Sequence, residues 1–157
     1  MKIVGLEFLN TDEWSIADLT GKYFKVIKMD NHKVGNLVRQ YAAKKSANGE
    51  NPNRAILDIL QDFNPNIVNV NLNTYCYTVN TSDGSEVVNL SELSSGERLC
   101  VMAEIVSYLE HETWFQGEIS SLTYKRRNAF ITKYANNQFV NLVVVNSELK
   151  DVLVSRI

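Results

Sequence analysis

A nearly continuous run of apolar, largely β-branched residues covers positions 139–145, close to the end of the chain. Such a run is typical of a strand buried on both faces, because a half-exposed strand alternates apolar with polar residues. Alternation and β-branched content predict further strands at residues 3–9, 23–29, 67–72, 75–80 and 86–90. Helical spacing predicts helices at residues 36–45, from 52 or 53 to 63, after the 93–97 segment with apolar residues from 99 to 109, at about 123–134 and at 147–153. Strands and helices follow one another in mixed order, so the sequence predicts an α/β fold, with residues 1–157 as a single domain.

The charge balance and the lack of long apolar segments exclude several classes of protein. Sixteen Lys and Arg residues stand against eighteen Asp and Glu, which disfavours a generally basic nucleic-acid binder. No apolar run approaches the ~20 residues that cross a bilayer, and the first residues lack the cleavage site of a signal peptide. We therefore expect a cytoplasmic protein without membrane contact.

The residues that commonly bind metals are few and scattered. Cys76 and Cys100 are too far apart in sequence for a metal cluster, and a disulfide framework needs more than two cysteines. His32 and His111 are the only histidines and have no neighbouring cysteine or aspartate at ligand spacing. We expect no metal site and two reduced thiols.

Asparagine is the one residue type in marked excess, with eighteen copies in the chain. Its side chain hydrogen-bonds nearby backbone groups, so it favours turns and helix caps over helix interiors. The excess predicts short elements with well-marked ends.

The segment LSSGE at residues 93–97 begins a strongly apolar-periodic helix. Ser94 or Ser95 would cap this helix, and Gly96 would let another molecule approach the backbone closely. A helix N-terminus offers free N–H groups and a positive dipole end, which favour anions. The spacing of Ser94 and Glu97 also fits a plain capping box, which needs no ligand.

The wider stretch VVNLSELSSGERL at residues 87–99 resembles the signature segment of ABC-type ATPases. It is most similar to the recombination and SMC-like branch of that family. Residues 1–10, MKIVGLEFLN, look like the opening strand of those ATPases, and residues 24–28 stand in the place of the strand before the phosphate loop. The resemblance implies a compact, ABC-ATPase-like mixed sheet with flanking helices, reduced in size.

The resemblance places the phosphate loop (Walker A) at residues 28–36, KMDNHKVGN, where the motif is degenerate. Asn31 matches an asparagine of the family's loop, but its three flanking glycine positions hold bulkier residues. Gly35 and Asn36 stand where the phosphate-binding Lys and the Mg²⁺-binding Ser belong. Lys33 is the alternative, as a displaced phosphate lysine, although the bulky neighbour that follows it argues against a tight loop.

The two remaining catalytic elements are degenerate as well. Glu118 stands at the Glu position of Walker B, but a glycine precedes it where the Mg²⁺-binding Asp belongs. Asn146 replaces the family's switch histidine and cannot exchange a proton near neutral pH. Losing these groups removes the charges that stabilise phosphoryl transfer. The chain is thus predicted to be a pseudo-ATPase, with no cofactor of its own and ATP–Mg²⁺ only if a partner shares it.

Lys125, Arg126 and Arg127 form the one dense basic run, on a predicted helix. A solvated helix face is its simplest interpretation, and contact with nucleic acid or an acidic partner is the alternative.

Together these patterns predict a protein that acts by association. ABC-type ATPases bind nucleotide between the phosphate loop of one subunit and the signature of another. A chain keeping only the signature, Ser94, Ser95, Gly96 and Glu97, would complete or block the site of a partner ATPase. Such a reduced chain would suit a regulator or inhibitor from a phage or mobile element. Two alternatives stay open: a self-associating structural or binding module in which LSSGE is only a helix cap, and a divergent active ATPase.

Overall fold

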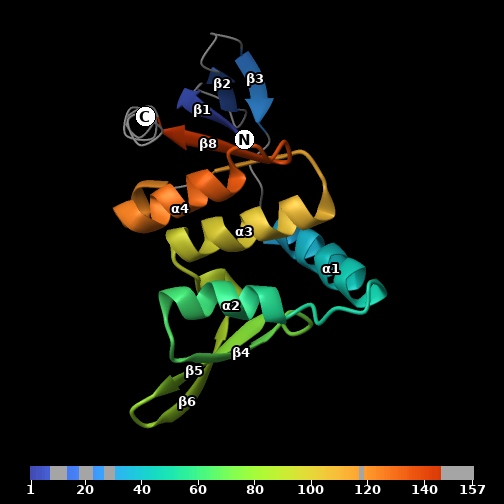
Figure 1. Cartoon of the computed structure of the whole chain (residues 1–157), viewed down its shortest axis with the longest axis vertical. Coiled ribbons are helices and arrows are strands. Elements are labelled where there is room, and N and C mark those ends of the chain that lie inside the picture. Colours follow the sequence, from blue (N-terminus) through green and yellow to red (C-terminus); the bar gives the residue numbers. More distant parts are fainter. Residues whose placement is uncertain (8–13, 18–22, 27–30, 117–118, 146–157) are drawn as a thin grey trace. The chain divides into compact units, whose positions relative to one another are not determined.

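The computed structural model describes residues 1–7, 14–17, 23–26, 31–116 and 119–145. The chain divides into two units, one formed by residues 1–29 and 110–157 and the other by residues 30–109 (Figure 1). Each unit has its own sheet and at least one helix, which confirms the α/β class. The predicted helix at 147–153 lies outside the described residues.

The first unit is built on a mixed five-stranded sheet of order β3-β2-β1-β8-β7. Its elements are β1 (Lys2–Glu7), β2 (Trp14–Ala17), β3 (Tyr23–Val26), β7 (Thr113–Gln116), a 3-10 turn η2 (Ile119–Ser121), α4 (Tyr124–Tyr134) and β8 (Val140–Val145). β8 runs parallel to both of its neighbours, β1 and β7, whereas β2 is antiparallel to β1 and β3. Val140, Asn141 and Leu142 have at most 1% exposure, which confirms a strand buried on both faces.

The second unit packs three helices with a three-stranded antiparallel sheet of order β4-β5-β6. Its elements are α1 (Asn31–Ala47), α2 (Arg54–Phe63), β4 (Ile67–Asn71), β5 (Cys76–Thr81), β6 (Gly84–Asn89), a 3-10 turn η1 (Leu90–Glu92) and α3 (Ser95–Leu109). One apolar core joins them, with buried side chains from each helix and from β4, among them Val38, Tyr41, Ile56, Leu60, Ile67, Val70, Val101 and Ile105.

Asparagines mark the ends of elements, as the composition predicts. In five places within the described part of the chain, an asparagine Oδ1 accepts a hydrogen bond from the backbone N–H two residues later, at 2.8 to 3.0 Å. These Asx turns are formed by Asn51, Asn64, Asn71, Asn89 and Asn137. Each one lies at or near the boundary of a helix or strand, where the side chain replaces the backbone partner that the regular element no longer supplies.

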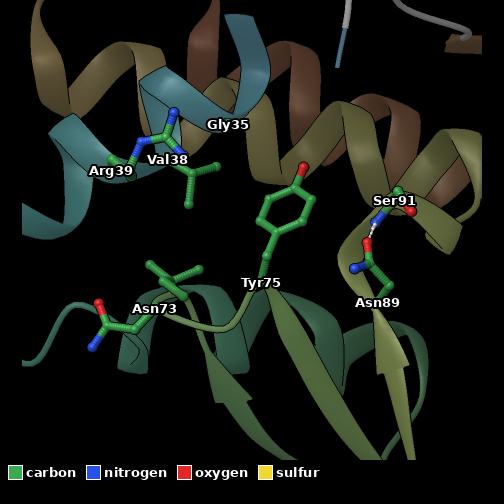
Figure 2. Close-up of a pocket in the computed structure, with 8 residues that line it drawn as sticks. Gly35, Val38, Arg39, Asn73, Tyr75, Asn89 and Ser91 are labelled. Atoms are coloured by element: carbon green, nitrogen blue, oxygen red, sulfur yellow. Dashed lines mark hydrogen bonds between the residues drawn. The ribbon is translucent and has the colours of Figure 1, made fainter. Parts of the chain in front are cut away.

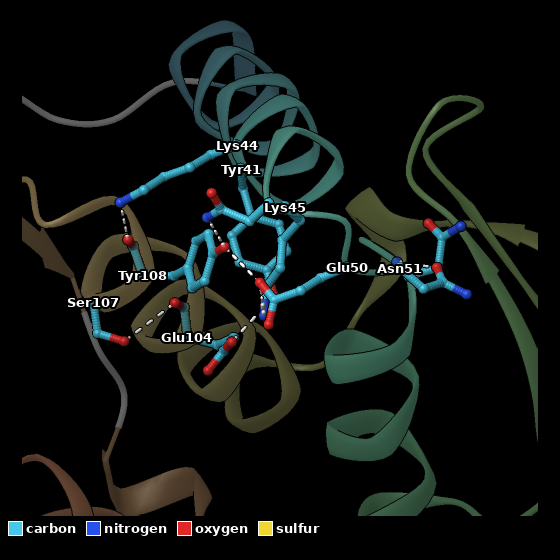
Figure 3. Close-up of polar contacts among 10 residues, drawn as sticks. Tyr41, Lys44, Lys45, Glu50, Asn51, Glu104, Ser107 and Tyr108 are labelled. Atoms are coloured by element: carbon cyan, nitrogen blue, oxygen red, sulfur yellow. Dashed lines mark hydrogen bonds and ion pairs between the residues drawn. The ribbon is translucent and has the colours of Figure 1, made fainter.

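A polar network fastens α1 to α3 (Figure 3). The buried Tyr41 hydroxyl donates to Glu104 at 3.1 Å, and Lys44 Nζ donates to the Tyr108 carbonyl at 2.6 Å. Lys45 Nζ lies 4.1 Å from the centroid of the Tyr108 ring, within range of a cation–π contact. Burial, followed by the charge of Glu104, raises the pKa of Tyr41 far above its usual value. These contacts join α1 to the C-terminal half of α3.

Three elements differ from the expectation. α1 begins at Asn31 and not at residue 36, so residues 31–35, which were expected in the phosphate loop, are the first turns of a helix. Gly35 is the residue of this segment that most disfavours a helix, and it costs only about 1 kcal/mol relative to alanine. The strands β2 and β7 were not predicted, since each has four residues and no clear alternation. In the part of the chain that the structure describes, no helix has the length and hydropathy needed to cross a membrane.

Candidate functional site

The signature segment is held in place by two buried leucines. Leu90 in η1 and Leu93 directly before α3 belong to the core of the second unit, with 4% and 7% exposure. Ser94 and Ser95 follow and are exposed, whereas Gly96 is buried. The apolar anchors therefore present two serine hydroxyls and the start of α3 to solvent.

The capping box is formed as its spacing predicts. The Ser94 hydroxyl donates to Glu97 Oε1 at 2.6 Å and accepts from the Glu97 backbone N–H at 3.4 Å. The Ser94 N–H in turn donates to the same carboxylate oxygen at 3.4 Å. The first intrahelical bond runs from the Arg98 N–H to the Ser94 carbonyl. The N–H groups of Ser95 and Gly96 belong to the first turn, where a helix has no acceptor of its own.

A cavity of about 450 Å³ lies beside this segment (Figure 2). It is lined by Gly35, Val38 and Arg39 from α1, by Leu72, Asn73 and Tyr75 from the connection between β4 and β5, and by Asn89 and Ser91. Buried Val38 and Leu72 give it apolar walls, and exposed Arg39 and Asn73 give it a polar rim. The cavity brings Gly35 of the expected phosphate-loop region close to Ser91, three residues before Ser94.

A second arginine ties the lining to α3. Arg98 donates to the Ser91 carbonyl at 2.7 Å. The Ser91 N–H donates to Asn89 Oδ1 at 2.9 Å (Figure 2). Burial raises the pKa of Tyr75, and the positive charge of Arg98 partly offsets the rise. The Tyr75 phenol is therefore neutral near pH 7, and the arginines supply the cationic character of this region.

The expected phosphate-loop residues do not form a loop. Asn31, Lys33, Gly35 and Asn36 all lie in the first turns of α1. From the fifth residue of an α-helix onward, which includes Gly35 and Asn36, each N–H points to the carbonyl four residues earlier, so these two groups cannot curl around a phosphate. Asn36 instead accepts a hydrogen bond from the Arg39 guanidinium.

Glu118 and Asn146, assigned to Walker B and the switch, lie outside the described residues. The strands that precede the two expected Walker regions, β3 and β7, are described. β3 and β7 are the two edges of the five-stranded sheet, with β2, β1 and β8 between them. Four strand spacings of ~4.8 Å separate the edges by about 19 Å.

The basic run is only partly a surface feature. Lys125 is exposed, but Arg126 and Arg127 are half-buried in the first turn of α4. The Arg126 N–H donates to the capping Thr123 hydroxyl at 3.3 Å, and the Arg127 guanidinium approaches the Leu122 carbonyl at 3.5 Å. The three residues thus do not form one continuous cationic patch.

Sequence reasoning missed the cavity residues Arg39, Leu72, Asn73, Tyr75, Asn89 and Ser91. They are single residues from three separate segments and carry no spacing signal. Across the described ranges, no group of three His, Cys, Asp or Glu side chains is arranged to hold a metal ion. In comparisons with known proteins, the chain matches no family model, no curated protein and no solved structure.

Proposed function

We propose that this chain is a non-catalytic, ABC-ATPase-like protein that acts by association, with a partner ATPase of that type or with itself. The observation that carries the proposal is the order of the five-stranded sheet, in which β3 and β7 form opposite edges. Phosphoryl transfer needs the phosphate cradle and the Mg²⁺-binding carboxylate around the same phosphate, within a few ångströms. The strands before the two expected Walker regions are therefore not neighbours in the sheet, which supports a non-catalytic chain.

The contact that we propose for a partner is the start of α3. Ser94 and Ser95 are exposed there, and the Ser95 and Gly96 N–H groups have no acceptor within α3, at the positive end of the helix dipole. These groups suit the terminal phosphate of a nucleotide bound by the partner's own phosphate loop. ATP and Mg²⁺ would come with the partner, and this chain would either complete that site or occupy it and block dimerisation.

The test is co-purification with candidate ABC-type ATPases in the presence and absence of ATP–Mg²⁺, together with the partner's ATPase rate. Ser95→Arg would place a bulky side chain at the contact without removing the capping serine, and we expect it to abolish nucleotide-dependent binding. Ser46→Arg, at an exposed serine of α1, is the matched control. A partner that binds Ser95→Arg as tightly as the unchanged chain would contradict the role of the signature.

A second candidate function is a binding module in which LSSGE is only a helix cap. The closed capping box favours it, because the Ser94 hydroxyl is already bound to Glu97 at 2.6 Å. Under this alternative, nucleotide has no effect on association and Ser95→Arg leaves it unchanged. Calorimetric titration with ATP–Mg²⁺, combined with molar-mass measurement, separates the two.

A further inference from the structure

The two edges of the three-stranded sheet, β4 and β6, differ in how they are protected against the addition of another strand. At the β4 edge the pairing with β5 is interrupted by an irregularity between Ile67 and Asn69. The Gln61 side chain donates to the Ile67 carbonyl at 2.9 Å, and the Leu72 N–H donates to Asn53 Oδ1 at 2.9 Å. A bulge and side chains bonded to the edge backbone are devices that prevent another strand from adding there.

Among the residues that the structure describes, none of these devices is found at the β6 edge. Its six residues pair with β5 in unbroken register, from Gly84 opposite Thr81 to Asn89 opposite Cys76. The sequence GSEVVN contains no proline, no lysine and a single charge, Glu86. Every residue of β6 except Val88 is exposed, and β6 lies on the far side of β5 from β4 (Figure 1). A regular, exposed and nearly uncharged edge is a template for strand pairing.

The alternation of hydrogen bonds along the β5–β6 hairpin shows which backbone groups of β6 do not bond to β5. The Leu90 N–H donates to the Tyr75 carbonyl at 2.9 Å, directly after β6. In an antiparallel pair the residues of one strand alternate between bonding the neighbour and facing away. Counting back from Leu90, the N–H and C=O groups of Ser85, Val87 and Asn89 point away from β5. The Val87 side chain, in the middle of this row, is 69% exposed.

We propose that β6 pairs antiparallel with β6 of a second copy of this chain, with Val87 facing Val87 at the two-fold axis. In this register Ser85 faces Asn89 of the other copy, and Glu86 faces Val88. The apolar contact is at the centre, a hydroxyl meets an amide on either side, and no charge faces a like charge. The three free residues also bond in a register that is symmetric about Val87, which is what a two-fold interface requires.

We choose a second copy of the chain as the partner of β6 because the β6 edge is complementary to itself. A foreign strand would have to supply an equally uncharged segment, whereas the second copy always brings one. The inference deepens the proposed function by giving self-association a surface, and it rests on that proposal only in taking the chain to act by association. β6 shares no residue with the contact proposed for a partner ATPase, so each can be tested alone.

The test measures molar mass against concentration by sedimentation with the full chain. We expect a concentration-dependent dimer, and we expect Val87→Pro to be monomeric with an unchanged circular dichroism spectrum. The Val87 N–H faces away from β5, so proline there removes a bond to the second copy and none within the hairpin. Val68→Lys, at a 44% exposed valine of β4, is the matched control for a lysine substitution at Val87, and we expect it to keep the dimer.

A charge exchange tests the register itself. Val87→Lys and Val87→Glu should each be monomeric, because like charges would face one another at the axis, and a mixture of the two should restore the dimer. A monomeric unchanged chain at millimolar concentration overturns the inference, as does a dimer that survives Val87→Pro. A monomer that still binds a partner ATPase through Ser95 would overturn this inference and leave the proposed function standing.

Discussion

The Ser94 hydroxyl and the Glu97 carboxylate close the first turn of α3 with a 2.6 Å hydrogen bond. This pair makes Ser94, and not Ser95, the residue that caps the helix. The signature segment therefore has a stabilising role that holds whether or not a nucleotide ever meets it.

We predict that Ser94→Ala lowers the free energy of unfolding by about 1 kcal/mol, since the loss of a serine N-cap costs roughly that amount. Ser95→Ala should change it by only a few tenths, because the Ser95 side chain stands outside the capping box. Urea denaturation of both variants measures the difference. Equal losses in the two variants would contradict the assignment of the cap.

Gly35→Ala distinguishes a helix from a phosphate loop. An added Cβ would meet only the Arg39 guanidinium, at 3.8 and 4.0 Å, which are ordinary contacts. Replacing glycine by alanine inside a helix then raises stability by about 0.5–1 kcal/mol. Thermal or urea unfolding checks the sign. A clear loss of stability would mean that residue 35 does not have the helical backbone described here.

Tyr41 should make the protein sensitive to alkali. Burial raises its folded-state pKa above the ordinary value of 10.0, so the folded protein holds the phenolic proton more tightly than the unfolded chain. The stabilisation is fully present below about pH 10 and is lost as the pH rises further. We predict that Tyr41→Phe has a shallower fall of stability above pH 10, whereas Tyr124→Phe, at a 71% exposed tyrosine, matches the unchanged chain. Unfolding midpoints between pH 8 and 11 give the comparison.

The isolated chain should not turn over ATP. A coupled phosphate-release assay with ATP–Mg²⁺ should show a rate no different from the background rate, with and without Glu118→Gln. Turnover that is abolished by Glu118→Gln would instead revive a divergent active ATPase.

Periodic apolar patterns were enough to predict the elements that bury one clear face. The helices α2, α3 and α4, the hairpin of β5 and β6, and the buried strand β8 all lie within a few residues of their predicted positions. In these elements apolar residues recur several times, at every third or fourth position in a helix or in a continuous run in β8. Repetition makes such signals robust to single exceptions.

The missed features depend on contacts between distant segments. β7 becomes a strand by pairing with β8, from Thr113 opposite Val140 to Gln116 opposite Val143, and nothing local in its four residues requires that. The first turns of α1 have a polar sequence, but they belong to a helix whose later residues are buried. The cavity is defined by single side chains from three segments, so only the folded chain can reveal it.

The five Asx turns have a consequence for how the chain reaches its fold. Each bond joins groups only two residues apart, so closing it restricts little chain entropy and needs no distant partner. The limits of these elements are consequently encoded at short range. A circular permutant that keeps each asparagine beside its own successors would retain them, even though its chain would begin and end at another point of the fold.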